Sequence, residues 1–259
     1  MLAERRQQLI LGIVRQDGPV SVGALVDKLG QSAATIRRDL IALDEEGLLK
    51  RVYGGAAPLP DERDEPFAVV ADVRVPEKAA IAARCASLVA DGQTVLLDIG
   101  TTALQVARLL RGRQLTVITT SLAVFDELRD DDDVELVLLG GMYRRQYRSL
   151  VGFLAEDALR QVHADVLVLG TSGVTADGHV VDTTIVEVPI KRAMIAASDR
   201  VVLAADGSKF PGSGVARVCD GRSLDVLVTD PSADPATCAA LGAAGVEVLT
   251  EHLTGALAV

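Results

Sequence analysis

The chain has 259 residues, of which 49% are hydrophobic and 24% charged, as is usual for a globular protein of one or two domains. The net charge of −10 argues against nonspecific binding of nucleic acid or anionic membranes by the chain as a whole. Three widely spaced cysteines, with no CxxC pair and no histidines near them, argue against disulfides and against a zinc site.

The charge is unevenly distributed along the chain. Residues 1–60 hold slightly more Lys and Arg than Asp and Glu, and the acidic excess lies almost entirely beyond them. Residues 58–66 read PLPDERDEP, a proline-rich and charged stretch that is typical of a linker. We therefore predict an N-terminal domain at 1–57, a linker at 58–76 and a larger domain at 77–259.

Three helices are predicted in the N-terminal part. An apolar stripe marks the first at 3–16, and Ser21 begins the second, which ends near Leu29. Gly30 makes the turn, and Ser32 caps a third helix that ends at about Glu46, before Gly47. This pattern predicts a helix-turn-helix.

The third helix has the composition of a DNA reader. Its buried stripe is Ile36, Leu40 and Leu43, which leaves small residues and two arginines in its first turns free to approach base edges and phosphates. The alternative is that Arg37 and Arg38 are ordinary solvated charges. The residues expected in the reading helix are Ser32, Ala33, Ala34, Thr35, Arg37 and Arg38.

A short wing is predicted after Gly47. The segment LLKRVYGGA alternates like a strand and ends in two glycines that permit a tight turn. Lys50 and Arg51 are placed to meet the phosphate backbone. The expected partner of this domain is double-stranded DNA.

These motifs resemble the N-terminal domain of DeoR-type bacterial transcription regulators. The resemblance is carried by ERRQQLILGIV, SVGALVDKLGQSAATIRRDL and LDEEGLLKRVYGGA. Thr35 to Leu40 match the family pattern fully. Tyr53 replaces the usual His of the wing, and Gln31 replaces an apolar residue before Ser32.

The remainder alternates strands with Ala-rich helices. Such alternation predicts a mainly parallel, doubly wound α/β sheet covered on both faces, with ligands beyond the carboxyl ends of its strands. The apolar runs of strand length are residues 94–99, 115–119, 134–140, 165–170, 200–206, 225–230 and 246–250.

The first of these strands leads into an anion-binding turn. Asp98-Ile99-Gly100-Thr101-Thr102 joins a strand to a helix, so backbone N–H groups, the helix N-terminus and hydroxyls converge there. A similar motif opens actin-like sugar kinases, but the chain that follows Asp98 is too short for their two lobes. A P-loop is also absent, so no nucleotide cofactor is expected.

Other polar groups are candidates for the same site. Thr119 to Ser121 end a strand with hydroxyls, and Arg144, Arg145 and Arg148 form a basic cluster in an acidic domain. Glu187 and Lys191 are four residues apart on a predicted helix, where an ordinary ion pair is the alternative. Lys209 lies in a turn that is able to bind ligand hydroxyls and phosphate.

The resemblance continues over nearly the whole chain. EKAAIAARCASLVADGQTVLLDIGTT, DVLVLGTSGVTADG and LAADGSKF look like the family's effector domain, whose Rossmann-like fold is similar to that of ribose-5-phosphate isomerase. Thr120 stands where the family often has Asn. The implied effector-binding residues are Asp98, Gly100, Thr101, Thr102, Glu187, Lys191 and Lys209, to which we add Thr120, Ser121 and Arg148.

The resemblance implies a DNA-binding repressor of carbohydrate-metabolism genes whose operator binding is relieved by a phosphorylated sugar. No catalytic residue, metal or cofactor is expected, and a homo-oligomer, dimer or tetramer, is. The alternative is a sugar-phosphate isomerase-like enzyme with a DNA-binding head. The sequence shows neither a signal peptide nor an apolar run of membrane length, so a cytoplasmic protein is expected.

Overall fold

The computed structural model describes the chain except for residues 1–2, 18–19, 47, 53, 58–66 and 254–259. The chain divides into two compact units, Met1–Glu65 and Pro66–Val259, each with its own core. No helix in the described part is long and apolar enough to cross a membrane.

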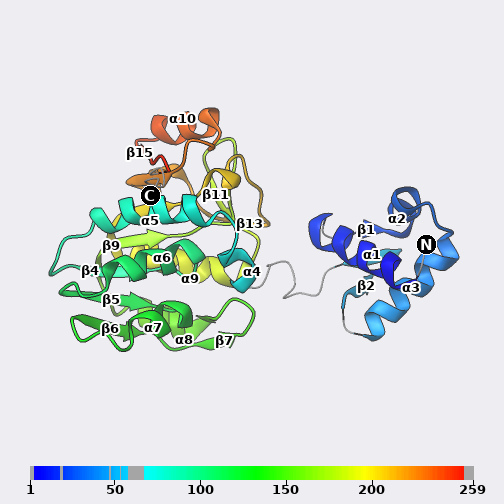
Figure 1. Ribbon diagram of the computed structural model, residues 1–259, viewed down its shortest axis with the longest axis horizontal. Coiled ribbons are helices and arrows are strands. Elements are labelled where there is room, and N and C mark those ends of the chain that lie inside the picture. Colours follow the sequence, from blue (N-terminus) through cyan, green and yellow to red (C-terminus); the bar gives the residue numbers. More distant parts are fainter. Residues whose placement is uncertain (1–2, 18–19, 47, 53, 58–66, 254–259) are drawn as a thin grey trace, which may run out of the picture. The chain divides into compact units, whose positions relative to one another are not determined.

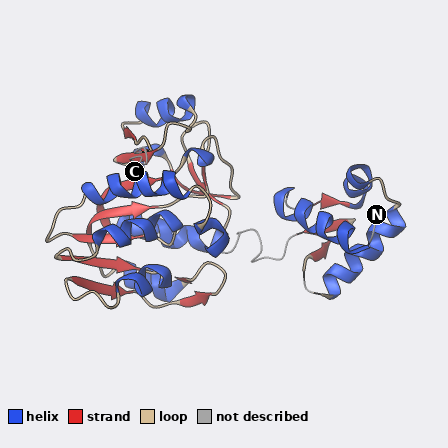
Figure 2. Cartoon of the chain, viewed as in Figure 1, coloured by secondary structure: helices blue, strands red, loops and turns tan. Residues whose placement is uncertain are grey.

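The first unit is a winged helix-turn-helix (Figures 1 and 2). Ile10, Leu25, Ile36 and Leu43 are among the fully buried side chains that join its three helices. The elements are α1 (Ala3–Asp17), β1 (Val20–Ser21), α2 (Val22–Leu29), α3 (Ala33–Glu45), β2 (Lys50–Val52) and β3 (Gly55–Ala57). The three predicted helices and the wing are therefore confirmed.

Two glycines make this unit geometrically possible. Gly30 ends α2 with φ of 62°, a left-handed conformation that favours glycine, and its N–H donates to the carbonyl of Val26. Gly55 of β3 pairs with Ser21 of β1. A Cβ atom at Gly55 would lie 2.1 Å from the carbonyl oxygen of Val20, so a side chain there would force the two strands apart.

A buried ion pair joins α1 to α3. The Nε and Nη2 atoms of Arg6 donate to the two carboxylate oxygens of Asp39 at 2.5 and 2.9 Å. Asp39 lies beside the exposed Arg37 and Arg38 in sequence, but it is buried. Its role is thus to fix α3 against α1, because a bidentate pair restrains orientation as well as distance.

The second unit is built on a fully parallel seven-stranded sheet in the order β15-β14-β12-β9-β4-β5-β6. All seven predicted apolar runs form its strands. They are β4 (Thr94–Leu97), β5 (Leu115–Thr119), β6 (Val134–Leu138), β9 (Ala164–Leu169), β12 (Ser198–Ala204), β14 (Val226–Thr229) and β15 (Glu247–Thr250).

Helices cover both faces of this sheet (Figure 1). Val95 and Leu97 of β4 face one core with α5 (Val75–Ser87), α6 (Thr101–Leu110) and α7 (Leu122–Leu128). Leu96, between them, faces the opposite core. The second layer consists of α8 (Phe153–Leu159), α9 (Val188–Ala196) and α10 (Pro235–Ala243). Successive residues alternate in direction along a strand, which is why strands covered on both faces are continuously apolar.

The direction of winding reverses between β4 and β9. The chain runs from β4 outward to β5 and β6, and then returns to β9 on the other side of β4. Ligands of open α/β sheets bind at the carboxyl ends of strands at such a switch point. Asp98 follows β4 and Gly170 follows β9, so the predicted site begins at this place.

Smaller elements frame that edge of the sheet. Sequence periodicity did not predict them because most have only two to five residues. They are α4 (Phe67–Ala71), the hairpin of β7 (Met142–Arg144) and β8 (Ser149–Val151), the small sheet of β10 (Gly173–Val174), β11 (Val180–Asp182) and β13 (Ala216–Cys219), and the 3-10 turns η1 (Ile185–Glu187), η2 (Gly207–Lys209) and η3 (Gly221–Ser223).

The predicted linker at 58–76 extends too far. Residues 58–66 lie outside the described residues, but α4 and the start of α5 fall within 67–76 and belong to the second unit. Phe67 is buried, and its ring packs edge-on against that of Tyr147, with 5.7 Å between the ring centroids. That aromatic contact, between residues far apart in sequence, folds the end of the predicted linker onto the domain.

Candidate functional site

Helix α3, the predicted reading helix, presents small and basic side chains to solvent. Ser32 caps it by accepting a hydrogen bond from the backbone N–H of Thr35 at 3.2 Å. Ala34, Arg37 and Arg38 are exposed, whereas Ile36 and Leu40 face the core. The cap and the buried stripe together fix which side chains can meet a DNA groove.

The wing carries the other two predicted DNA contacts. Lys50 and Arg51 lie on β2 and are exposed. The backbone N–H of Arg51 donates to Asp44 Oδ1 at 2.9 Å, which ties the wing to α3. The reading helix and the wing are therefore held in one orientation.

A small hollow lies at the carboxyl ends of β4, β9 and β12. Its volume is about 50 Å³, and its walls include four of the predicted effector-binding residues, Gly100, Thr101, Thr102 and Lys209. Gly100 is the N-cap of α6 and has no side chain with which to cap it. The first N–H groups of α6 and two hydroxyls thus converge on a point where an anion is favoured.

Lys78 of α5 is a wall residue that sequence reasoning missed. It is buried, and its Nζ donates to the carbonyl oxygen of Val70 in α4 at 2.5 Å. Burial lowers the pKa of Lys78, with Lys209 and Arg74 lowering it further and Asp206 opposing them. The sequence signal that could have identified Lys78 is a lysine at a core-facing position of a mainly apolar helix.

Beneath this hollow lies a buried charge cluster. Lys191 Nζ donates to Asp98 Oδ2 at 2.5 Å and to the carbonyl of Gly170 at 3.0 Å, and it lies 3.6 Å from Asp182 Oδ2. The N–H of Gly170 donates to the same Asp98 oxygen at 2.9 Å. Gly170 lines the hollow, so Asp98 and Lys191 form the layer behind its wall.

Glu187 and the predicted arginine cluster are arranged differently from the prediction. Arg144, rather than Arg148, turns inward, and it forms an ion pair with Glu187 in which both side chains are largely buried. Arg148 pairs with Asp126 at the surface and does not line the hollow. The alternative of an ordinary ion pair between Glu187 and Lys191 is not observed, because each binds a partner distant in sequence.

The two hydroxyls that follow β5 are fully buried. Ser121 caps α7 by accepting from the N–H of Val124 at 3.3 Å, which gives it a structural role. Thr120 Oγ1, Asp98 Oδ1 and Ser149 Oγ are buried without a hydrogen-bond partner within the described residues. Buried polar atoms of this kind commonly have a partner, such as a ligand or water.

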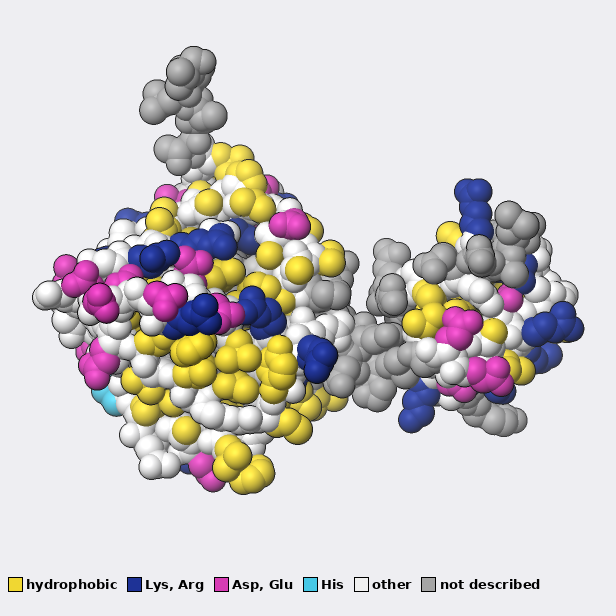
Figure 3. All heavy atoms as spheres, turned by 60° about the horizontal axis from the view of Figure 1, so that its bottom comes forward, with side chains coloured by type: hydrophobic (Ala, Val, Ile, Leu, Met, Phe, Trp, Pro, Cys, Tyr) yellow, Lys and Arg dark blue, Asp and Glu magenta, His cyan; other side chains and the backbone are white. Residues whose placement is uncertain are grey.

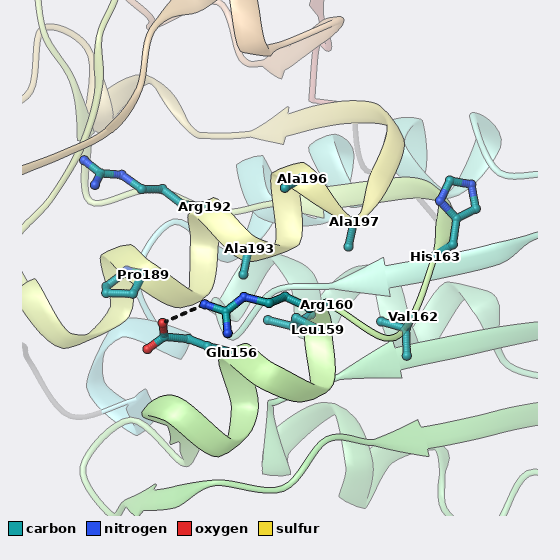
Figure 4. Close-up of a pocket in the computed structure, with 10 residues that line it drawn as sticks. All are labelled: Glu156, Leu159, Arg160, Val162, His163, Pro189, Arg192, Ala193, Ala196 and Ala197. Carbon is teal, nitrogen blue, oxygen red and sulfur yellow. Dashed lines mark ion pairs between the residues drawn. The ribbon is translucent and has the colours of Figure 1, made fainter.

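A larger groove lies elsewhere, between α8 and α9 (Figure 4). Its volume is about 550 Å³, but none of the predicted effector-binding residues lines it. Leu159, Pro189, Ala193 and Ala196 give it apolar walls, and Glu156 and Arg160 form an ion pair at its side. Size alone therefore does not locate the effector site.

The cysteines do not form a reactive or metal-binding centre among the described residues. Cys85, Cys219 and Cys238 are unpaired thiols, and no group of three metal-ligating side chains is found in the described part. Burial raises the pKa of Cys85 and that of Cys219 to about 12, which keeps both protonated at neutral pH.

Comparison with known families and proteins identifies both units. Residues 6–60 match the DeoR-like helix-turn-helix domain, and residues 73–231 match the DeoR C terminal sensor domain. The transcriptional repressor AccR of Agrobacterium fabrum is 39% identical over 228 residues, which cover 87% of this chain and 88% of AccR. The glycerol-3-phosphate regulon repressor of Escherichia coli K12 is 33% identical over 253 residues and covers 97% of each chain.

Solved structures give more distant matches. Ribose 5-phosphate isomerase A of Neisseria gonorrhoeae matches 52% of this chain and 53% of its own at 18% identity, with a TM-score of 0.37. The translation initiation factor eIF-2B of Pyrococcus horikoshii covers 87% of this chain and 86% of its own at 14% identity, with a TM-score of 0.42. On the two family matches and the full-length relatives, the chain belongs to the DeoR family of transcription regulators.

Proposed function

We propose that this protein is a repressor of carbohydrate-metabolism genes, released from double-stranded operator DNA by a phosphorylated sugar. The observation that carries the effector class is the hollow at the start of α6. There Thr101 and Thr102 meet two lysines, Lys78 and Lys209. Helix N–H groups, hydroxyls and ammonium groups together suit a phosphate better than any neutral group.

The sugar end of the effector is proposed to lie against the ends of β4 and β5. Asp98 Oδ1 and Thr120 Oγ1 are buried there without hydrogen-bond partners among the described residues. An acceptor and a hydroxyl of this kind suit the hydroxyls of a sugar. Lys191 and Glu187 are proposed to position this wall, because their charges are engaged by Asp98 and Arg144.

The size of the hollow supports a movement on binding. A volume of about 50 Å³ holds one or two waters, whereas small-molecule sites commonly measure about 300–1,000 Å³. Val70 of α4 and Lys78 form part of the wall and are joined by one hydrogen bond. A phosphate that binds Lys78 would break its hydrogen bond to the carbonyl of Val70 and free α4 to move. Helix α4 is the first described element after residues 58–66.

Release then follows from linkage. The proposal is that the state with a displaced α4 binds operator more weakly. An effector that prefers this state then lowers operator affinity, and operator DNA weakens effector binding by the same factor. The relatives named as repressors of the glycerol-3-phosphate regulon and of the aga operon support carbohydrate-metabolism genes as targets. Two reading heads in a homo-oligomer would contact two half-sites, and the second contact becomes effectively intramolecular.

We propose binding without turnover, in preference to an isomerase with a DNA-binding head. An isomerase requires a carboxylate that is available to abstract a proton. Here Glu187 is held by Arg144, while Asp182 accepts from Ser172 Oγ and from the N–H of Thr184. Both of these carboxylates have structural partners. Asp98 is bonded to Lys191 through Oδ2, and its Oδ1, which has no partner among the described residues, is the one carboxylate oxygen left for the isomerase alternative.

Thermal unfolding of the full chain with matched sugars tests the effector class. Aldose and ketose phosphates are compared with the same sugars lacking phosphate, and with inorganic phosphate. A true effector at about 100 times its Kd stabilises the native state by about 2.7 kcal/mol, and its unphosphorylated counterpart does not. Equal stabilisation by both members of every pair, or by neither, would contradict the proposal, and turnover of a bound sugar phosphate would favour the isomerase.

A further inference from the structure

Arg74 stands at the junction between α4 and α5 with a backbone conformation that is unusual for its type. Its φ of 53° lies in the left-handed region, which costs free energy for a residue that has a Cβ atom. Within the described part, Arg148 is the one other non-glycine residue with a positive φ. Glycine adopts this conformation without strain, so the reason for an arginine here lies in its side chain.

The side chain of Arg74 is held by the loops that follow two strands of the parallel sheet. Its Nη2 atom donates to Ser232 Oγ at 2.6 Å and to Asp230 Oδ1 at 3.2 Å, both in the loop after β14. Its Nε atom lies 3.1 Å from Asp206 Oδ1, after β12. Glu77, in the first turn of α5, lies 3.2 Å from Nη2. Arg74 thus ties the start of α5 to the carboxyl ends of β12 and β14.

The two loops are built alike. In each, the Oδ1 atom of an aspartate accepts from the N–H and the hydroxyl of the serine two residues further on. Asp206 accepts from Ser208 at 3.0 and 2.5 Å. Asp230 accepts from Ser232 at 2.9 and 2.5 Å, and its Oδ2 accepts from the N–H of Gly207 at 2.6 Å, which joins the two loops. Both carboxylates are therefore fixed by the loops themselves.

These ion pairs differ from those at the surface. Figure 3 shows a face of the second unit on which Lys and Arg side chains lie beside Asp and Glu side chains, and exposed pairs of this kind contribute little to stability. The side chains of Asp206 and Asp230 are each only 3% exposed. Loss of Arg74 would leave two buried carboxylates without this cation, so its removal from them is resisted.

Arg74 is linked to the effector hollow on two sides. Its partner Asp206 lines the hollow. Lys78, another wall residue, lies one turn further along α5, and its N–H donates to the carbonyl of Arg74 at 3.0 Å. Helix α4 is therefore held at two points. Lys78 binds the carbonyl of Val70, and the short connection that leaves α4 after Ala71 ends at the anchored Arg74.

We propose that Arg74 is a latch that keeps α4 against the effector hollow, and that opening of this latch favours phosphate binding there. This rests on the proposed function and deepens it, by naming the contact that resists the displacement of α4. When the binding-competent state is only a small fraction of the population, the apparent affinity is reduced by that fraction. Weakening the latch should therefore raise the affinity for phosphate by the same factor as it raises the opening of α4.

Two serines of the full chain provide a matched test. Ser232→Ala removes an uncharged partner of Arg74 that does not line the hollow. Ser208→Ala is the control, because Ser208 is also exposed and makes the same bonds to its own aspartate, while no hydrogen bond joins it to Arg74 in the described part. Circular dichroism checks that each variant is folded.

Hydrogen exchange of residues 67–73, followed by mass spectrometry in phosphate-free buffer, measures the opening of α4. Exchange should be about tenfold faster in Ser232→Ala than in the wild type or Ser208→Ala, because a hydrogen bond to a charged group is lost. Inorganic phosphate, titrated by calorimetry, should bind Ser232→Ala about tenfold more tightly. Arg74→Met should speed exchange at least as much, and Arg74→Lys should restore part of the protection.

The two measurements separate the latch from the site that it covers. Unchanged exchange in folded Ser232→Ala and Arg74→Met would overturn the latch alone. Faster exchange in Ser232→Ala with unchanged or weaker phosphate binding would overturn its coupling to the hollow. Absence of phosphate binding in every protein, including the wild type, would contradict the effector site itself.

Discussion

Lys191 of α9 and Asp98 at the end of β4 are bonded at 2.5 Å, with both side chains buried. Burial lowers the pKa of Lys191, but the attraction of Asp98 and Asp182 outweighs it, so the pKa is raised and the ammonium stays charged. The pair holds one carboxylate oxygen of Asp98 and leaves the other without a protein partner within the described residues. A helix and a strand thereby fix the layer behind the wall of the hollow, against which we propose the sugar lies.

Replacing Lys191 with Met should strongly destabilise the second unit. The substitution leaves Asp98 and Asp182 buried without their counterion, and breaking a buried pair in this way costs about 3–5 kcal/mol. Denaturant unfolding measures the loss. Lys209→Met removes a half-buried lysine from the same unit and should cost much less. Equal unfolding midpoints for the two variants would show that the pair does not stabilise the wall.

Arg38→Ala should weaken operator binding and leave the fold intact, because Arg38 is exposed on α3. A bidentate arginine contact is worth about 1–3 kcal/mol, which corresponds to a loss of roughly 5- to 150-fold in affinity. Fluorescence anisotropy at fixed salt measures it, since phosphate contacts make affinity depend on salt. Arg5→Ala is the matched control, an exposed arginine on α1 with the same change in charge. If the two variants bind equally, Arg38 is not a reading residue.

Thr101→Val should leave operator binding unchanged and raise the effector concentration needed for release. The substitution keeps the shape of the side chain and removes a hydroxyl that lines the hollow. A hydrogen bond to a charged group contributes about 1.5–3 kcal/mol, so the concentration should rise roughly 10- to 150-fold. Thr116→Val is the control, because Thr116 lies near the start of β5 and does not line the hollow. Release of Thr101→Val at the ordinary concentration would remove Thr101 from the site.

Effector affinity should fall at alkaline pH because of Lys78. Its pKa is lowered from the ordinary 10.5 by burial, so it loses its proton earlier than an exposed lysine. A phosphate binds the protonated form, and affinity is therefore retained below the pKa of Lys78 and lost as pH rises through it. Titration calorimetry between about pH 7.5 and pH 10 measures the fall.

Lys78→Arg provides the comparison for this pH dependence. Arginine stays charged throughout the range, so the alkaline loss of affinity should be reduced in the variant. The same loss in both proteins would mean that another group titrates, and that Lys78 does not contact the phosphate.

Much of the fold follows from local patterns. The seven strands of the parallel sheet were predictable because each is a mainly apolar run, and the inner strands β4, β9 and β14 are almost entirely buried. The reading helix was predictable from the cap at Ser32 and the stripe through Ile36 and Leu40. These signals lie within one element and need no knowledge of its neighbours.

The details of the site follow from contacts that no local pattern contains. Lys78 is held at the wall of the hollow by its hydrogen bond to the carbonyl of Val70. Arg144, rather than Arg148, turns inward because it forms an ion pair with Glu187, which is distant in sequence. Asp39 looks like part of the reading surface in sequence, but its partner Arg6 lies on another helix. Several of the residues predicted for the effector site line one hollow, but the sequence could not choose between neighbouring charges that point to opposite sides.

The most direct test of the central claim is operator release by a sugar phosphate. Labelled DNA from upstream of the protein's own gene is bound at fixed salt and followed by anisotropy, with and without a mixture of sugar phosphates. We expect specific binding that the mixture reverses, and no reversal by the same sugars without phosphate. Specific binding that no sugar phosphate changes would contradict the proposed effector site while leaving the DNA reader in place.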